Sequence, residues 1–238
     1  MRRVPSRQAW LTALAAAAVT LALFARPAAA QIWMGTPAPR AGSVELGGGV
    51  LWAQGYDLGG TPAELTRNPT TGSSPLRLFD STSRLDAASG LVARLGVYLS
   101  RSVSLEGGFQ YSKPVLGVRV SGDFEGADAA TISESISRYV FDGAVVVHLV
   151  PLSFAGGRGM PFVTGGAGYV RELHEGNELV ETGQQYHAGA GVKLWFGERR
   201  RRFGIRGDVG FAVREGGSDF SDGRRTVPTA AASLIYLF

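Results

Sequence analysis

Three histidines are the residues of this sequence best suited to acid–base or metal chemistry. His148 and His187 lie in segments of alternating apolar and polar residues, and His174 lies in the acidic stretch RELHEGNELVE. The chain contains no cysteine, which excludes disulfides, thiolate nucleophiles and cysteine-based metal sites together. The candidates that remain combine histidine with carboxylates or hydroxyls.

The stretch around His174 is the one candidate cation site. Glu172, Glu175 and Glu178 surround the histidine, and carboxylate and imidazole groups are common ligands of divalent cations. The same residues also describe a solvated acidic loop at the protein surface. We favour the loop, and we expect no metal site and no cofactor.

The first thirty residues have the pattern of a cleavable signal peptide. Arginines precede an apolar run from Ala9 to Phe24, and Ala28 and Ala30 then occupy the small-residue positions of a cleavage site. The run is shorter than the roughly 18 residues of a membrane helix, which disfavours an uncleaved anchor. The expected divisions are a signal peptide at 1–30, a short N-terminal segment at 31–42 and the folded domain at 43–238.

The charge balance changes once this leader is set aside. The whole chain has 24 lysines and arginines against 20 acidic residues, and its pI is near 9.7. The leader holds four of the arginines and no acid, so 20 residues of each sign remain. The positive excess that would attract nucleic acid is therefore lost, and no nucleic-acid partner is expected.

The rest of the sequence alternates between apolar and polar residues in eight segments, and it shows almost no helical periodicity. In SVSLEGGFQYS, Val103, Leu105 and Phe109 fall on one face, while Glu106 and Gln110 fall on the other. This period of two predicts β-strands. The predicted strands lie at 43–53, 90–99, 102–112, 137–149, 161–173, 186–196, 203–214 and 226–238.

These segments have about the 9–11 residues that a strand needs to cross a bilayer at a tilt. A sheet in lipid must close on itself, because the hydrocarbon cannot satisfy an open edge. The sequence therefore predicts an all-β fold, an eight-stranded antiparallel up-and-down transmembrane β-barrel that follows a signal peptide. Side chains largely fill the interior of so small a barrel.

Charged side chains are expected inside this barrel. They fall opposite the apolar face of each segment, and acids and bases are nearly balanced. Buried charges need partners, so an ion-paired network is predicted for the lumen. Its predicted members are Glu45, Arg94, Glu106, Arg138, Asp142, Arg171, Lys193, Arg206 and Asp208. Arg171 can be assigned to either face, because it shares its parity with Tyr169.

Long and short connections between the segments mostly alternate. The connection after the first strand exceeds thirty residues, the next has about three, and the third has about twenty. Outer-membrane barrels have long loops outside the cell and short turns in the periplasm. Both termini and the segment 31–42 are then expected in the periplasm. The long connections are predicted to be loops that expose the aromatic residues Tyr56, Phe79, Phe124 and Phe220.

Taken together, these features resemble the small outer-membrane β-barrel proteins, the OmpA-like transmembrane β-barrel group. The resemblance covers essentially all of residues 31–238 and depends on the leader, the eight segments and the terminal LIYLF. It implies a monomer in the cell outer membrane of a Gram-negative-type bacterium, in contact with outer-membrane lipid and lipopolysaccharide. Because the chain ends at the barrel, the peptidoglycan-binding domain of full-length relatives is not expected.

The resemblance also implies a role for the last residues. Alternating apolar residues that end in an aromatic residue resemble the signal read by the barrel-assembly machinery. Leu234, Tyr236 and Phe238 occupy those positions, so this machinery and periplasmic chaperones are expected as partners during biogenesis. Alternatively, the three residues only seal the last strand in lipid.

Three classes of function remain open. The favoured one is a non-enzymatic, porin-like barrel with a structural or surface-interaction role for its extracellular loops. The first alternative is a narrow channel or small-ligand carrier. The second is a lipid-modifying enzyme similar to a lipid A deacylase. Such an enzyme needs a Ser–His–acid group aimed at lipid, whereas His148 and His187 fall on the polar face.

Overall fold

The computed structural model describes residues 39–65, 76–174, 179–196, 202–216 and 224–238. This part of the chain consists of strands, their connections and one short 3₁₀ helix, η1 (Val150–Leu152). No helix within it has the length and apolar character needed to cross a membrane. The predicted signal peptide, with Ala28 and Ala30, lies outside the described residues, as does most of the segment 31–42.

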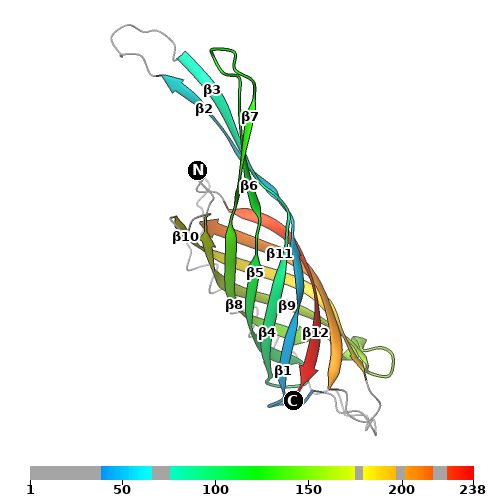
Figure 1. Ribbon diagram of the computed structural model, residues 1–238. Coiled ribbons are helices and arrows are strands. Elements are labelled where there is room, and N and C mark those ends of the chain that lie inside the picture. Colours follow the sequence, from blue (N-terminus) through cyan, green and yellow to red (C-terminus); the bar gives the residue numbers. More distant parts are fainter. Residues whose placement is uncertain (1–38, 66–75, 175–178, 197–201, 217–223) are drawn as a thin grey trace, which may run out of the picture. The chain divides into compact units, whose positions relative to one another are not determined.

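Eight strands close into an antiparallel barrel (Figure 1). Around the wall their order is β1-β12-β11-β10-β9-β8-β5-β4, and β4 pairs again with β1. All eight predicted strands are present, with ends shifted by a few residues. The predicted barrel is therefore confirmed. The strands are β1 (Val44–Ala53), β4 (Ala88–Tyr98), β5 (Val103–Ser112), β8 (Ser137–His148), β9 (Gly159–Leu173), β10 (Val180–Phe196), β11 (Phe203–Gly216) and β12 (Arg225–Leu237).

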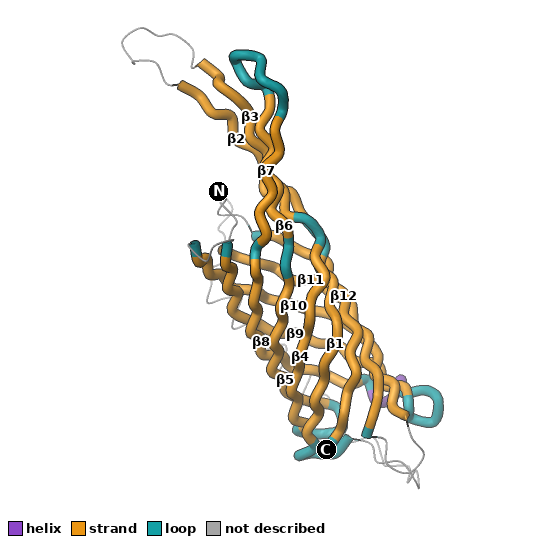
Figure 2. The backbone as a smooth tube through the Cα atoms, viewed as in Figure 1, coloured by secondary structure: helices purple, strands orange, loops and turns teal. Residues whose placement is uncertain are grey.

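Four further strands form a second sheet, in the order β2-β3-β6-β7 (Figure 2). β2 (Tyr56–Leu65) and β3 (Leu76–Leu85) lie in the first long connection, and β6 (Val115–Ser121) and β7 (Ala130–Ser135) lie in the third. The prediction that these connections are loops was wrong over much of their length. The reason is that the outer parts of β2 and β7 are exposed on both faces, so no alternation marks them in the sequence.

Each strand of the second sheet continues a barrel strand after a short break. Gln54 and Gly55 separate β1 from β2, and Ile136 alone separates β7 from β8. The breaks keep cross-strand hydrogen bonds: the amide of Ile136 donates to the carbonyl of Pro114 at 2.9 Å. The second sheet therefore extends from the barrel wall at one end, the sheet end. The opposite end, the turn end, carries Val44, Phe238, Arg202 and the connections 99–102 and 149–158.

A small apolar cluster fills the junction between barrel and second sheet. Leu85, Leu116 and Ile136 are buried there, and Tyr56 packs against them. Tyr56 is therefore half-buried instead of being presented by a loop, whereas Phe124 is 65% exposed. Phe220 lies outside the described residues. The cluster fixes the root of the second sheet.

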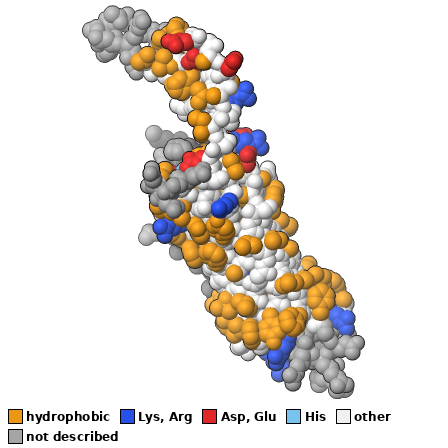
Figure 3. Space-filling model, viewed as in Figure 1, with side chains coloured by type: hydrophobic (Ala, Val, Ile, Leu, Met, Phe, Trp, Pro, Cys, Tyr) orange, Lys and Arg blue, Asp and Glu red, His pale blue; other side chains and the backbone are white. Residues whose placement is uncertain are grey.

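The barrel exposes its apolar residues and buries most of its charged ones. On β4, Leu91 and Leu95 are 61% and 54% exposed, while Val92 between them is 4% exposed. Apolar side chains accordingly cover much of the barrel surface in Figure 3. Aromatic rings gather at both ends of this surface. The ring centroids of Tyr111 and Tyr139 are 5.1 Å apart towards the sheet end. Those of Phe203 and Tyr236 are 4.8 Å apart at the turn end.

Candidate functional site

The barrel interior at the turn end contains a fully buried lysine bound to two carboxylates. Nζ of Lys193 donates to both carboxylate oxygens of Glu45, at 2.8 and 2.9 Å, and to Oε1 of Glu106 at 3.3 Å. Glu45 also accepts a hydrogen bond of 2.7 Å from the hydroxyl of Tyr98. Lys193 has no exposed surface, so its charge depends on these partners.

The ion pairs continue from Glu106 to two arginines. Arg206 donates to Oε2 of Glu106 at 2.6 Å and to Oδ1 of Asp208 at 2.8 Å. Arg94 donates to Oδ2 of Asp208 at 3.1 Å and to the hydroxyl of Ser233 at 3.1 Å. Acids and bases thus alternate along one chain of contacts, which we call the lumen network. Its charged members are Glu45, Lys193, Glu106, Arg206, Asp208 and Arg94, three of each sign.

Strand alternation places the lumen network. Each of its members occupies an inward position, and they come from β1, β4, β5, β10 and β11. Side chains from five strands can meet because an eight-stranded barrel is narrow enough for opposite walls to touch. Removal of one partner from such a buried pair costs about 3–5 kcal/mol, since the remaining charge is left uncompensated.

An apolar layer lies beside the network at the turn end. Tyr98, Trp195, Ile235 and Leu237 form a buried cluster inside the barrel, which we call the apolar plug. The ring of Phe162 lies 4.4 Å from the guanidinium of Arg206, within the range of a cation–π contact. The lumen is therefore a packed core of ion pairs and apolar side chains. The sequence pattern predicts only the ionic part.

The remaining predicted lumen residues lie outside this network. Arg138 faces inward nearer the sheet end, where its Nε donates to Glu172 at 2.5 Å. Asp142 also faces inward and accepts from Gln110 at 2.9 Å. Arg171 is exposed on the outward face of β9. The assignment of Arg171 to the lumen was therefore wrong, because Glu172 takes the inward position.

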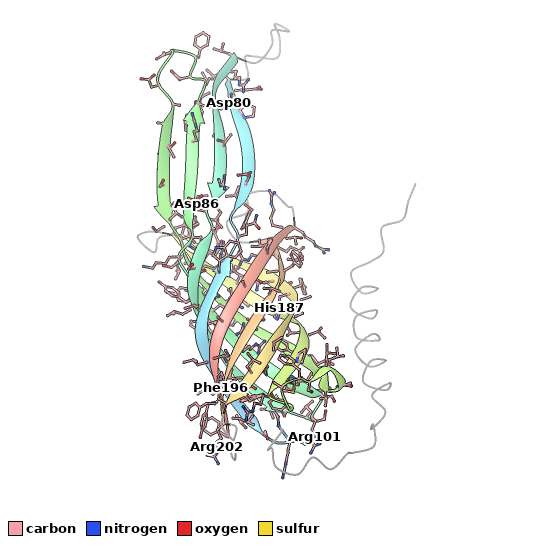
Figure 4. All side chains as sticks on the ribbon, turned by 90° about the vertical axis from the view of Figure 1, so that its right-hand side faces the viewer. Asp80, Asp86, Arg101, His187, Phe196 and Arg202 are labelled. Atoms are coloured by element: carbon pink, nitrogen blue, oxygen red, sulfur yellow. The ribbon has the colours of Figure 1, made fainter. Side chains whose placement is uncertain are left out.

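A small cavity of about 70 Å³ lies in the lumen between these two regions. This volume can hold a few water molecules. Its polar lining comes from both regions and includes Arg94, Glu106, Asp142, His187 and Asp208. Figure 4 places His187 within the barrel, away from both ends. Cavity and network together indicate a lumen that is nearly filled.

His148 makes a serine contact that the sequence pattern does not predict. Its Nε2 lies 3.1 Å from Oγ of Ser104, and its ring stacks on Tyr98 with centroids 5.0 Å apart. Among the described residues no carboxylate contacts Nδ1 of His148, so the acid that orients a catalytic histidine is missing from this pair. Ser104 and His148 are also buried inside the barrel, at 0% and 2% exposure respectively, away from the lipid-facing surface.

His174 connects the barrel rim to the second sheet. Its two ring nitrogens lie 3.0 Å from Glu134 on β7 and 3.4 Å from Glu181 on β10. Of the carboxylates considered from the sequence, Glu172 pairs with Arg138 instead, and residues 175–178 are outside the described ranges. Within those ranges, no three His, Asp or Glu side chains are grouped to hold a metal ion.

Leu234, Tyr236 and Phe238 face the outside of the barrel, the first two on β12 and Phe238 directly after it. Leu234 and Phe238 are 72% and 66% exposed. The ring of Tyr236 lies 4.7 Å from that of Phe238 and 4.8 Å from that of Phe203. This geometry suits contact with lipid, and the assembly role of these residues stays a prediction.

Closed walls, an apolar exterior and a packed ionic interior define a small β-barrel of the outer-membrane type. No family model and no curated protein matches the chain. Among solved structures, it is similar to the outer membrane protein OprG from Pseudomonas aeruginosa, with a TM-score of 0.50 and 11% identity over 84% of this chain and 97% of OprG. The resemblance to small outer-membrane β-barrels is thereby confirmed for the fold.

Two other solved structures give weaker similarities. One is Ail, the attachment invasion locus protein of Yersinia pestis, with a TM-score of 0.42 and 12% identity over 83% of this chain and 99% of Ail. The other is the outer membrane protein AlkL, with a TM-score of 0.35 and 12% identity over 90% of this chain and 95% of AlkL.

Proposed function

We propose that this chain is an outer-membrane protein whose filled barrel anchors the second sheet on the cell surface for contact with other macromolecules. The barrel supplies the membrane anchor, because its apolar exterior lies between two sets of aromatic rings, as in transmembrane barrels. The role is non-enzymatic and combines the structural and surface-interaction functions expected from the sequence.

The orientation follows from the two ends of the barrel. The sheet end carries the two longest connections, from β1 to β4 and from β5 to β8, which hold the second sheet. The longest connections of outer-membrane barrels lie outside the cell. The second sheet is then extracellular, and both termini are periplasmic. The protein would reach this position through the barrel-assembly machinery and periplasmic chaperones, and it would contact lipopolysaccharide near the sheet end.

The filled lumen is the observation that favours an anchor over a channel. The lumen network crosses the interior from β1 to β10 and β5, and the apolar plug closes the turn end. A solute would have to break several buried ion pairs to pass. The cavity of about 70 Å³ supports a narrow channel or small-ligand carrier only as the alternative function.

The edge of β7 that faces away from β6 is the best candidate for the contact surface. β9 ends at Leu173, opposite Ser137, so β7 extends beyond it, and no described strand pairs with its outer edge. An open edge can accept an extended segment of another chain. The other edge strand of this sheet, β2, is protected by Pro62, by two register shifts and by Gly59 at φ 101°.

Single cysteines in this cysteine-free chain test the proposal. Ser133→Cys lies on β7, and Ser100→Cys lies in a turn at the opposite end; both positions are exposed. In intact cells, a membrane-impermeant maleimide should label Cys at position 133, and it should label position 100 only after lysis. The protein should show no stable conductance in planar bilayers. Labelling at position 100 in intact cells would reverse the orientation, and steady single-channel currents would favour the channel.

A further inference from the structure

Four exposed arginines lie at the turn end. Arg40 precedes β1, Arg101 lies in the connection of β4 to β5, Arg158 in that of β8 to β9, and Arg202 directly before β11. Figure 4 labels Arg101, Arg202 and Phe196 at this end. Apart from the terminal carboxylate of Phe238, the described carboxylates nearby belong to Glu45 and Glu106, which are buried and already paired. The described surface of the turn end therefore carries an excess of positive charge.

The connection from β8 to β9 adds apolar side chains to this basic end. Val150, Leu152 and Phe154 are 37%, 63% and 47% exposed. They lie in this connection and not on the lipid-facing wall of the barrel. Phe154 and Gly159 exchange backbone hydrogen bonds of 3.0 and 3.1 Å. A Cβ at Gly159 would lie 2.3 Å from the ring of Phe154, so this glycine makes room for the ring. The exposed apolar residues are thus held in a defined turn next to Arg158.

Arg202 also lies at the level of the aromatic residues. Nη1 of Arg202 donates to the hydroxyl of Tyr236 at 3.2 Å, and Tyr236 packs against Phe203 and Phe238. Aromatic belts of transmembrane barrels lie at the membrane interface. A guanidinium bound to a belt tyrosine is therefore at the depth of lipid phosphates, which arginine recognises through paired hydrogen bonds.

We infer that the turn end is a docking surface for anionic phospholipids of the periplasmic leaflet. Arg101, Arg158 and Arg202 bind the phosphate groups, and Leu152 and Phe154 enter the adjacent acyl region. The inference rests on the proposed orientation, because that orientation places the turn end at this leaflet. The excess of positive charge selects anionic over zwitterionic lipid, and the exposed apolar turn selects a lipid over a free anion.

Native mass spectrometry of the barrel refolded in detergent micelles tests this inference. The probes are phosphatidylglycerol, phosphatidylcholine and inorganic phosphate. The triple variant R101Q/R158Q/R202Q should lose at least tenfold in phosphatidylglycerol binding, since each surface arginine contributes to anionic-lipid affinity. The matched control R77Q/R84Q/R119Q removes three arginines from the second sheet and should bind as the natural chain does. The variant L152S/F154S should weaken both phospholipids alike.

Three outcomes would overturn the inference. They are equal loss of lipid in the two triple variants, equal binding of both phospholipids by the natural chain, and full displacement of lipid by millimolar inorganic phosphate. A gel with and without boiling shows that each variant is folded before it is scored. Because the measurement is made in micelles, it does not depend on orientation in the cell. The cysteine-labelling test of orientation can therefore fail while the turn end still selects anionic lipid. Lipid selectivity can likewise be absent while the labelling supports the orientation.

Discussion

Lys193 on β10 and Glu45 on β1 are separated by 148 residues in the sequence, yet Nζ of the lysine lies 2.8 and 2.9 Å from the two carboxylate oxygens. β10 and β1 are not neighbours in the barrel wall, since β11 and β12 lie between them. The pair therefore crosses the lumen. It joins strands that share no backbone hydrogen bonds, and it is the best position at which to test the lumen network.

Lys193→Met should destabilise the refolded barrel by about 3–5 kcal/mol, because it leaves Glu45 and Glu106 buried without their shared cation. Urea unfolding in lipid vesicles, followed by tryptophan fluorescence, measures this change. The double variant Glu45→Gln/Lys193→Met should recover part of the loss, since one uncompensated charge is removed with its partner. Strictly additive effects of the two substitutions would show that the pair is not coupled.

Gly49→Val should prevent barrel closure, whereas Gly48→Val should be tolerated. A Cβ at Gly49 would lie 2.0 Å from the carbonyl oxygen of Ala232 on the adjoining strand, while a Cβ at Gly48 meets nothing within 4 Å. The fraction of protein that migrates as a folded barrel on an unboiled gel measures closure. Equal folding of the two variants would contradict the close approach of β1 and β12.

These two predictions use features that the sequence reveals to different degrees. The eight barrel strands are visible because lipid on one side and a packed lumen on the other impose a strict period of two, as at Leu91 to Leu95. The same parity places Glu45, Glu106 and Lys193 inside. It cannot identify their partners, because strand order and tilt decide which inward side chains meet across the lumen.

The period of two no longer separates inward from outward residues where both faces of a strand meet similar surroundings. At the sheet end, Arg171 and Glu172 are adjacent charges, and only the structure shows that Glu172 pairs with Arg138 inside. The second sheet has solvent on both faces of its outer part, so hydrophobic alternation is lost there. The apolar plug is equally hidden, because Tyr98 and Trp195 near strand ends have the composition of an interfacial aromatic belt.

Removal of the apolar plug should open the turn end. The double variant Trp195→Ala/Ile235→Ala deletes two of the four side chains of this cluster and should increase ion leakage through the protein in planar bilayers. Leu234→Ala is the control, because Leu234 is 72% exposed on the outer face of the same strand as Ile235. Unchanged leakage in the double variant would mean that the lumen network alone seals the barrel.

Phe238→Ser separates an assembly signal from a lipid seal. A signal read by the barrel-assembly machinery predicts reduced outer-membrane levels in cells, severalfold or more, with normal spontaneous refolding in vitro. A seal predicts that both processes suffer, because the exposed aromatic surface at the turn end is lost in either setting. Quantitative blotting of membrane fractions and refolding yields in vesicles distinguish the two.

The alternating charges inside the barrel also constrain how the protein can enter a membrane. Glu45 belongs to the first strand and Lys193 to the sixth barrel strand in chain order, so neither can be neutralised by the other until most of the wall is in place. A half-inserted intermediate would expose unpaired charged side chains to the hydrocarbon of the bilayer. We therefore expect insertion and closure of the barrel to be nearly simultaneous, with the amino-terminal and carboxyl-terminal strands meeting as the ion pairs form.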